Sequence, residues 1–169
     1  MPTKKTVPSS DCEMTESGHL FIVATPIGNM NDITSRAVGV LRSVDYIAAE
    51  DTRVTKGILK RFRILTPIKS YHDFSNERDR ERILLDLLQG KSVALVSDAG
   101  TPLISDPGYK LVRMAREQNI SVKSVPGACS LIAALSVSGL PTDSFQFDGF
   151  IPTKTLARTT FETLRISSV

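Results

Sequence analysis

Three stretches rich in glycine, proline and hydroxyl side chains could bring the protein backbone close to a ligand. They read "TPIGN", "SDAGTPLISDPG" and "VPGACS", and each follows a predicted strand. Because glycine has no Cβ, Gly28, Gly100 and Gly127 leave room for a ligand against the main chain. For any one loop the simpler interpretation is that glycine and proline end a strand. Three such loops together favour a binding cleft.

Two further stretches could supply acid–base chemistry. The stretch "AEDTR" contains Glu50, Asp51 and Arg53, and the stretch "YHDFSNE" contains His72 and Asn76. A carboxylate or an imidazole can take a proton from a hydroxyl group that acts as a nucleophile. Taken alone, Asp51 is at least as well explained as the cap of the helix that follows it. In the same way, His72 is at least as well explained as a surface loop residue.

The ligand of the cleft is expected to carry little phosphate charge. The three loops contain no Lys or Arg, and the chain has no G-x-G-x-x-G after its first predicted strand and no G-x-x-x-x-G-K-[ST]. These are the usual patterns that hold dinucleotides and nucleoside triphosphates. Recognition by backbone groups and small hydroxyls is therefore expected.

The elements that must position these loops alternate between short apolar runs and longer amphipathic segments. Strands are expected at residues 20–25, 44–49, 67–71, 91–97 and 120–125. Helices are expected at residues 32–43, 52–62, 75–90, 106–119 and 126–139. This alternation predicts an α/β fold with a mostly parallel five-stranded sheet and helices on both faces. All three glycine loops then lie at the carboxyl ends of strands, where parallel sheets bind ligands.

Local signals predict where three of the helices begin or end. Asp32 is expected to cap the first helix, and Ser75 is expected to cap the third, which stops at Gly90. The fourth helix is expected to open at Asp106, with Pro107 at its first helical position.

Composition restricts the class of protein. With 169 residues, 41% hydrophobic and 23% charged, the chain can form one good core. No apolar run approaches the ~20 residues of a membrane span, and the N-terminal stretch lacks the apolar middle of a signal peptide. We therefore expect a cytoplasmic protein without a membrane partner. Cys12 and Cys129 suit two reduced thiols better than a disulfide or a metal site, so no metal is expected.

The chain from His19 to about Leu164 resembles the tetrapyrrole methylase superfamily. The resemblance rests on "HLFIVATPIGNMNDITSRAVGVLRSVDYIAAEDTRVTKGIL", "SDAGTPLISDPG" and "VPGACSLIAALSVSGLPTDSFQFDGFIPTK". Within the superfamily the chain is most similar to the branch of ribosomal RNA small-subunit methyltransferase I. Relatives that act on tetrapyrroles usually have Gly-Asp-Pro where this chain has Gly100, Thr101 and Pro102, and Thr is usual in the ribosomal branch.

The resemblance implies an enzyme that uses S-adenosylmethionine to methylate the ribose 2′-hydroxyl of a cytidine in small-subunit ribosomal RNA. It further implies a homodimer of two-domain chains, with the cofactor between the domains. The implied cofactor-binding residues are Pro26, Ile27, Gly28, Gly100, Thr101, Pro102, Ile104, Pro126, Gly127 and Ala128. The candidate catalytic residues are Asp51, Glu50, Arg53 and His72.

A basic segment, "TRVTKGILKRFR", is a candidate contact for the RNA. The chain has a formal net charge of +3 and a pI near 9.0, and this segment has little acid beside it. Residues three and four apart share one face of a helix. Lys56, Lys60 and Arg61 are therefore expected to form an exposed patch that touches phosphates. The alternative is a solvated helix face.

The chain is expected to consist of three parts. Residues 1–18 are expected to be a disordered extension, residues 19–143 an N-terminal α/β methyltransferase domain, and residues 144–169 the start of a second domain. Because members of the family are much longer, we expect this chain to be an incomplete and inactive portion. Two alternatives stay open: a methylase of a small tetrapyrrole, and a non-catalytic module for RNA binding or dimerisation. The basic segment favours RNA over a tetrapyrrole.

Overall fold

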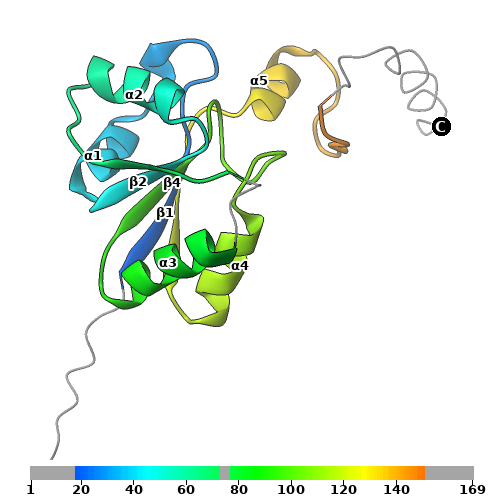
Figure 1. The fold of residues 1–169 in the computed structure, drawn as a ribbon. Coiled ribbons are helices and arrows are strands. Elements are labelled where there is room, and N and C mark those ends of the chain that lie inside the picture. Colours follow the sequence, from blue (N-terminus) through cyan, green and yellow to red (C-terminus); the bar gives the residue numbers. More distant parts are fainter. Residues whose placement is uncertain (1–17, 73–76, 151–169) are drawn as a thin grey trace, which may run out of the picture.

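A five-stranded parallel sheet flanked by helices forms the body of the protein in a computed structural model, which describes residues 18–72 and 77–150 (Figure 1). The strands are β1 (His19–Val23), β2 (Tyr46–Ala49), β3 (Ile68–Ser70), β4 (Val93–Val96) and β5 (Ser121–Val125). The helices are α1 (Ser35–Ser43), α2 (Thr52–Arg61), α3 (Glu77–Leu88), α4 (Tyr109–Glu117) and α5 (Ser130–Val137), with a 3₁₀ turn η1 (Met30–Asp32). The predicted α/β class is confirmed.

The order of the strands is β3-β2-β4-β1-β5, and every neighbouring pair is parallel. The central strands β2 and β4 are buried along their whole length. Strands covered on both faces are continuous apolar runs because neither side chain direction meets water. The sequence "YIAA" and the sequence "VALV" follow this rule.

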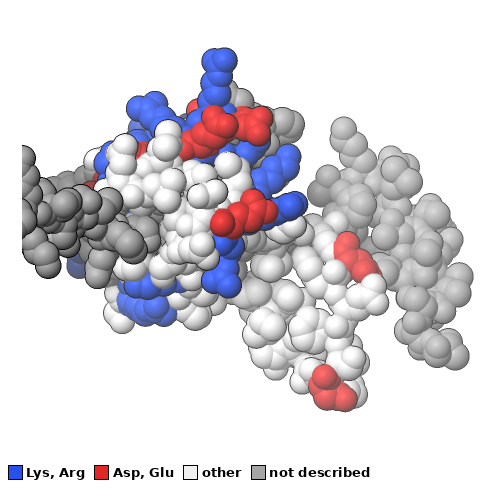
Figure 2. All heavy atoms as spheres, turned by 90° about the horizontal axis from the view of Figure 1, so that it is seen from below, with Lys and Arg blue, Asp and Glu red and all other residues white. Residues whose placement is uncertain are grey.

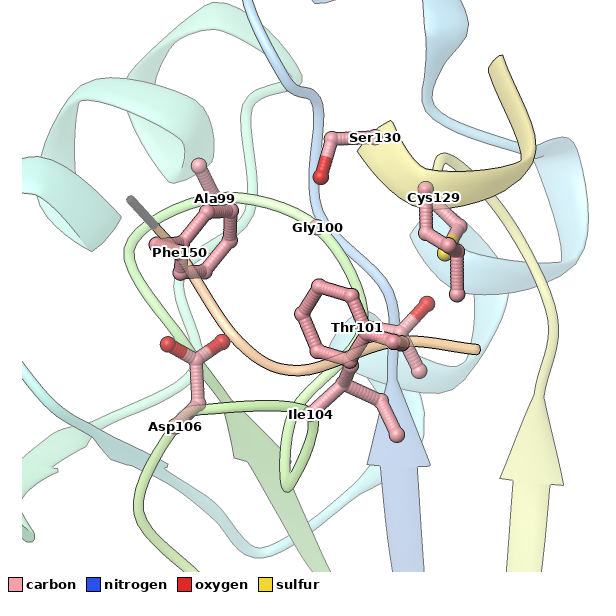
Figure 3. A pocket seen from close by; sticks show the side chains of 10 residues that line it. Ala99, Gly100, Thr101, Ile104, Asp106, Cys129, Ser130 and Phe150 are labelled. Carbon is pink, nitrogen blue, oxygen red and sulfur yellow. The ribbon is translucent and has the colours of Figure 1, made fainter. Parts of the chain in front are cut away.

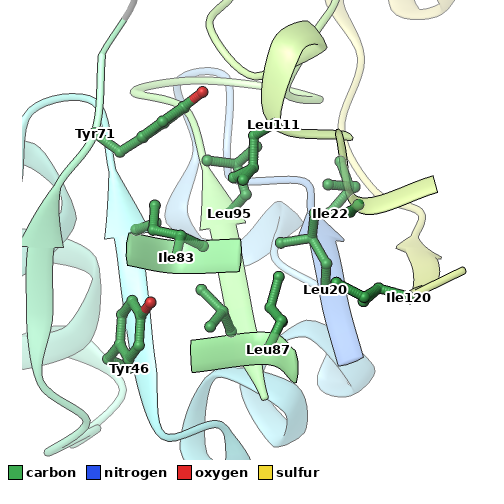
Figure 4. Close-up of a cluster of buried hydrophobic side chains, with 12 residues drawn as sticks. Leu20, Ile22, Tyr46, Tyr71, Ile83, Leu87, Leu95, Leu111 and Ile120 are labelled. Atoms are coloured by element: carbon green, nitrogen blue, oxygen red, sulfur yellow. The ribbon is translucent and has the colours of Figure 1, made fainter. Parts of the chain in front are cut away.

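Two apolar clusters, one on each face of the sheet, hold the helices in place. Successive residues of a strand point to opposite faces. One cluster joins the sheet to α3 and α4 through Ile83, Leu87, Leu111 and Ala115 (Figure 4). The other joins the sheet to α1 and α2 through Ala37, Leu41 and Leu59. Helices therefore cover both faces, as predicted, and all the loops after the strands open at one edge.

Two of the predicted helix starts are wrong. The cap of α1 is Thr34, whose Oγ1 accepts a hydrogen bond of 3.0 Å from the N–H of Ala37, and Asp32 lies in η1 instead. Asp32 and Thr34 are both good capping residues. Because Asp32 belongs to the η1 turn, Thr34 caps α1. The helix α4 begins at Tyr109, after Gly108, and has no side-chain cap. The predicted cap Ser75 lies outside the described residues.

Gly108 explains the late start of α4. Its φ is +130°, and a Cβ there would lie 2.6 Å from Cδ2 of the core residue Leu95. Residues with a side chain rarely adopt such a φ. The chain therefore uses this glycine to turn tightly over β4 before the helix can begin, and Asp106 stays in the loop.

The helix α5 is apolar on all sides, yet none of its residues is buried. Ile132 is 53% exposed and Val137 is 84% exposed, and the segment that follows α5 exposes Leu140, Phe145 and Phe150. Figure 2 shows this part of the surface as largely uncharged, apart from acidic spots. A helix that is hydrophobic all round is normally buried. Within the described residues, this face has no partner that covers it.

A buried carboxylate ties α3 to one end of the sheet. Asp86 accepts hydrogen bonds from Tyr46 Oη at 2.9 Å, Lys69 Nζ at 3.2 Å and Lys91 Nζ at 2.5 Å. The ammonium of Lys69 also lies 3.5 Å from the centre of the Tyr46 ring. Burial raises the pKa of Asp86, but the hydrogen bonds from Lys91, Tyr46 and Lys69 outweigh it and lower the pKa to about 2. The short edge strand β3 is thereby fastened to α3.

Replacing Asp86 with Asn is expected to lower the free energy of unfolding by about 1.5–3 kcal/mol at pH 7, because Lys69 and Lys91, which are half-exposed, lose their shared charged acceptor. The folded-state pKa of about 2 lies below the usual 3.8. The contribution is therefore present above about pH 4 and is lost as the pH falls toward 2. Urea unfolding at several pH values measures it. Glu81→Gln, on the exposed side of α3, is the control, and a difference that persists unchanged at low pH would contradict the assignment.

Candidate functional site

The three glycine loops meet at the carboxyl edge of the sheet. They follow β1, β4 and β5, and β1 lies between the other two strands. Thr25 and Gly100 exchange backbone hydrogen bonds of 2.9 and 3.1 Å, which join the first loop to the second. Thr101 Oγ1 donates to the carbonyl oxygen of Ala128 at 3.2 Å, which joins the second loop to the third. The sequence separates these loops widely, and the parallel sheet brings them together.

The three glycines do different things. Gly28 has a φ of +145°, and apart from its chain neighbours no atom of the described residues lies within 4 Å of the position its Cβ would take. Gly100 has a φ of +86°, and its Cβ would lie 3.3 Å from Cγ2 of Ile27. A Cβ on Gly127 would lie 3.0 Å from the Cβ of Ala24. Gly28 therefore faces open space, whereas Gly127 allows the third loop to pack against the end of β1.

A small hollow of about 30 Å³ lies in front of the second loop (Figure 3). The residues that line it are Ala99, Gly100, Thr101, Ile104, Asp106, Cys129, Ser130, Leu131, Phe147 and Phe150. A wider apolar hollow of about 440 Å³ adjoins it, and the two share Ser130, Leu131, Phe147 and Phe150. Among the predicted cofactor-binding residues, the structure places Gly100, Thr101 and Ile104 in the small hollow.

The other predicted cofactor-binding residues stand behind or beside this hollow. Pro102 is buried, Ile27 packs beside Gly100, and Ala128 accepts the hydrogen bond from Thr101. Pro26 is buried next to the bridge between the first two loops, and Pro126 is exposed. These residues shape the loops and contribute no lining to the small hollow.

Sequence reasoning did not identify two aromatic residues of the hollow, Phe147 and Phe150. Their rings meet edge to face, with 5.9 Å between the ring centres, and both line the small and the wide hollow. They come from a segment without regular secondary structure, which follows α5. Isolated aromatic residues in such a segment carry no periodic signal that would assign them to a site.

A buried hydroxyl stands at the root of the second loop. Ser97 follows β4 and is 2% exposed, and its Oγ has no hydrogen-bond partner among the described residues. Its carbonyl oxygen accepts a hydrogen bond of 3.1 Å from Thr25 Oγ1. Buried polar groups are normally satisfied. Among the described residues, the Ser97 hydroxyl is therefore left without a hydrogen bond, close to the point where the loops converge.

Asp51 caps α2, which is the simpler of its two sequence interpretations. Its Oδ1 accepts a hydrogen bond of 2.8 Å from the N–H of Arg53, and its Oδ2 pairs with Arg53 Nη2 at 2.6 Å. The side-chain and backbone hydrogen bonds from Arg53 lower the pKa of Asp51 to about 2. A carboxylate with this pKa is a weak base while the pair is intact. Its use as a base therefore requires Arg53 to move away.

Asp98 connects this acidic stretch to the glycine loops and was missed by sequence reasoning. Its Oδ1 accepts a hydrogen bond of 2.9 Å from the N–H of Asp51. The contact exists because β2 and β4 are neighbours and end at the same edge. Glu50 is half-buried directly after β2, and His72 is exposed after β3, on the next strand outward. Asn76 lies outside the described residues.

The predicted basic patch lies on α2. Lys56, Lys60 and Arg61 are all exposed, and the first two border a hollow of about 350 Å³ between α2 and the β3 edge. Arg53, at the first turn of the same helix, has a side chain that is 88% exposed. Exposed positive charge therefore extends along α2, from the acidic stretch at its start to the β3 edge of the sheet.

The ranges that the structure describes are residues 18–72 and 77–150. They contain no cluster of three or more histidine, cysteine, aspartate or glutamate side chains that could hold a metal ion. No helix in the same part of the chain is both long and apolar enough to cross a membrane.

Comparison with known proteins gives a family match and close relatives. The family model described as tetrapyrrole (corrin/porphyrin) methylases matches residues 19–165. A protein of Vibrio cholerae named ribosomal RNA small subunit methyltransferase I is 54% identical over 94% of this chain and 53% of its own length. Proteins of the same name from Escherichia coli O157:H7 and Synechocystis are 52% and 55% identical over 83% of this chain. The chain spans about half the length of the curated relatives it matches.

Solved structures share the fold. A uroporphyrin-III C-methyltransferase from Thermus thermophilus superposes with a TM-score of 0.57 at 24% identity, over 73% of this chain and 54% of that chain. A diphthine synthase superposes with a TM-score of 0.58 at 17% identity, over 73% of this chain and 50% of that chain. At these identities the likeness concerns the arrangement of the sheet and its helices.

Proposed function

Because this chain belongs to the tetrapyrrole (corrin/porphyrin) methylase family, we propose that it supplies the methyl-donor cleft of a ribosomal RNA methyltransferase. The reaction would transfer a methyl group from S-adenosylmethionine to the ribose 2′-hydroxyl of a cytidine in small-subunit ribosomal RNA. The observation that carries this proposal is the identity of 52–55% to relatives named ribosomal RNA small subunit methyltransferase I. The solved tetrapyrrole enzyme is less similar, at 24%.

The residues of the cleft suit S-adenosylmethionine, which supplies an activated methyl group when bound. The three loops carry no Lys or Arg, and this ligand carries no phosphate. Gly28 offers open space above its backbone, and the Ser97 hydroxyl, which has no hydrogen-bond partner among the described residues, is buried at the root of the second loop. Gly100 and Thr101 would hold the ligand through backbone and hydroxyl groups. The rings of Phe147 and Phe150 narrow the hollow and would form one of its apolar walls.

The acidic stretch beside the cleft would handle the proton of the ribose hydroxyl. We assign the role of base to Asp51, with Glu50 and His72 as the alternatives. The ion pair between Arg53 and Asp51 has an exposed arginine, and exposed pairs are worth little. A phosphate of the RNA could therefore draw Arg53 away. The Asp51 carboxylate would then recover a higher pKa and become a better base.

The apolar face of α5 supports a second structural unit. We propose that residues 19–143 form one domain and that a second domain, which starts at residue 144, packs on this face. Burial of the exposed side chains Ile132, Val137 and Leu140 would stabilise the contact. A homodimer, in which a second copy covers the same face, is the other arrangement we consider. Either arrangement would close the cleft against water, which methyl transfer requires.

Methylation of purified small ribosomal subunits tests the proposed function. The protein expressed from its complete gene is incubated with S-adenosylmethionine that carries a labelled methyl group, in one reaction with subunits and in a parallel reaction with a porphyrin precursor. The expected product is 2′-O-methylcytidine, found after digestion of the RNA to nucleosides. Label in a porphyrin precursor and none in the RNA would replace this function by tetrapyrrole methylation. Binding of subunits without any transfer would favour the non-catalytic module.

Exchange of Lys56, Lys60 and Arg61 for Gln is expected to weaken binding to small ribosomal subunits and to flatten its dependence on salt. Each lost phosphate contact makes the negative slope of log K against log salt shallower by about 0.7–0.9. The side chains are exposed, so the melting temperature should stay unchanged. Filter binding at several salt concentrations measures both quantities, with Lys123→Gln on β5 as the control. Unchanged affinity and slope would show that the patch is only a solvated helix face.

A further inference from the structure

A second groove adjoins the small hollow in front of Gly100, which we assign to the methyl-donor cleft. Asp106 lines the small hollow in front of Gly100 and also a second cavity of about 370 Å³. Tyr71, Arg80, Tyr109 and Lys110 line the second cavity together with Asp106. Its volume lies within the range of about 300–1,000 Å³ that is usual for sites of small organic ligands. One carboxylate therefore stands between the two sites.

The second cavity continues along the surface between α3 and α4. A hollow of about 410 Å³ shares Arg80, Tyr109 and Lys110 with it and adds Glu77, Arg113, Met114 and Glu117. We call these two connected hollows the α3–α4 groove. Figure 1 shows α3 and α4 side by side on the face of the sheet opposite α1 and α2. The groove is therefore separate from the basic patch of α2.

The chemistry of the α3–α4 groove is mixed in a way that matches a nucleotide. Tyr109 is 66% exposed, so its ring is available to stack on a flat base. Lys110 and Arg113 are exposed cations on the same helix and could meet a phosphate. Asp106 supplies an oxygen that can accept a hydrogen bond from a ribose hydroxyl or an exocyclic amine. A simple anion would use only the cations, and an apolar ligand would use only the rings.

The guanidinium of Arg113 interacts with both Glu117 and the Tyr109 side chain. The hydrogen bond between Arg113 Nε and Glu117 Oε1, 2.8 Å long, raises the pKa of Arg113, and the Tyr109 side chain contributes to the same shift. The ion pair is exposed on both sides, at 65% and 56%, so a phosphate can replace the carboxylate at small cost. Tyr109 thus lies next to a guanidinium that can bind a phosphate.

We propose that the α3–α4 groove binds one nucleotide of single-stranded RNA next to the nucleotide that enters the methyl-donor cleft. Its base would stack on Tyr109, its phosphate would meet Lys110 and Arg113, and Asp106 would contact its ribose or base. Aromatic side chains beside cations are the usual platform for single-stranded RNA, because every base has a flat face. The inference rests on the proposed function, and it specifies the side from which the RNA strand reaches the site.

The test uses the protein expressed from its complete gene and a fluorescent single-stranded RNA of six cytidines, read by anisotropy. Tyr109→Ala is expected to weaken binding at least about fivefold, and Tyr109→Phe is expected to bind as the wild type because it keeps the ring. Lys110→Gln is expected to lower the salt dependence by about one phosphate contact. The control is Arg116→Gln, an exposed cation of α4 outside the lining of the groove.

The readouts separate this inference from the proposed function. Binding of S-adenosylmethionine by calorimetry and methylation of ribosomal subunits by the wild type test the function itself. If both occur and Tyr109→Ala and Lys110→Gln bind the RNA like Arg116→Gln, the groove is a solvated surface and the inference is overturned. The same conclusion holds if the variants lose affinity for whole subunits in filter binding but keep it for the six-cytidine RNA, because the groove then contacts a part of the subunit other than a single RNA strand.

Discussion

Replacement of Gly100 by Val is expected to abolish the binding of S-adenosylmethionine, measured by calorimetry on the protein expressed from its complete gene. Gly100 lines the small hollow in front of the second loop and exchanges backbone hydrogen bonds with Thr25. Its φ of +86° disfavours a β-branched side chain, and the new Cβ would lie 3.3 Å from Ile27. The added methyl groups would occupy ligand space, and the strain would shift the loop.

Two companion variants make this result interpretable. Gly39→Ala changes a helical glycine of α1 whose Cβ meets no atom within 4 Å, and it should bind as the wild type. Gly28→Ala adds a Cβ that meets no protein atom within 4 Å, so it alters ligand space without a clash, although its φ of +145° strains a residue with a side chain. Circular dichroism and melting temperature show whether each variant is folded. Full affinity in a folded Gly100→Val protein, together with full affinity in Gly28→Ala, would reduce both glycines to turn formers.

Asp51→Asn is expected to lower turnover by about a hundredfold or more while the protein stays folded and binds S-adenosylmethionine. Asn caps a helix nearly as well as Asp, so α2 should keep its first turn. The amide cannot take the proton of the ribose hydroxyl, and loss of a general base costs about 10²–10⁴ in rate. Single-turnover methylation of small ribosomal subunits measures the effect without a contribution from product release.

The alternatives for Asp51 lead to different results. If the residue acts only as a cap, Asp51→Ala should lower stability and Asp51→Asn should have nearly normal turnover. If Glu50 or His72 is the base, Glu50→Gln or His72→Asn should show the large loss instead. Asp98→Asn removes the charge that holds the N–H of Asp51 and is expected to have a smaller effect on turnover. Normal turnover in Asp51→Asn contradicts the assignment.

Local sequence patterns placed the elements well because burial acts on each segment separately. The runs "LFIVAT", "VDYIAA" and "KSVALVS" predicted strands; β2 and β4 lie within theirs, and β1 begins one residue before its run, at His19. The basic segment after "AED" predicted a helix, and α2 occupies residues Thr52–Arg61 of it. The start of α1 was harder, because Asp32 and Thr34 compete as caps and only the η1 turn decides between them.

The sequence by itself determined that three glycine loops would share one edge of the sheet. Strands that alternate with helices run parallel, and parallel strands end on the same side. The free space over Gly28 and the tight packing at Gly127 were not visible at that level, because both depend on neighbours distant in the chain.

Only the tertiary structure decided which loops touch. The order β3-β2-β4-β1-β5 places β4 between β2 and β1, and this brings Asp98 to the backbone of Asp51. The packing of α3 beside α4 forms the groove around Tyr109, and the chain after α5 brings Phe147 to the hollow. Propensity and periodicity act over a few residues. Strand order and helix packing instead depend on how the apolar surface of the whole chain is buried, so these contacts arise only when the sheet is assembled.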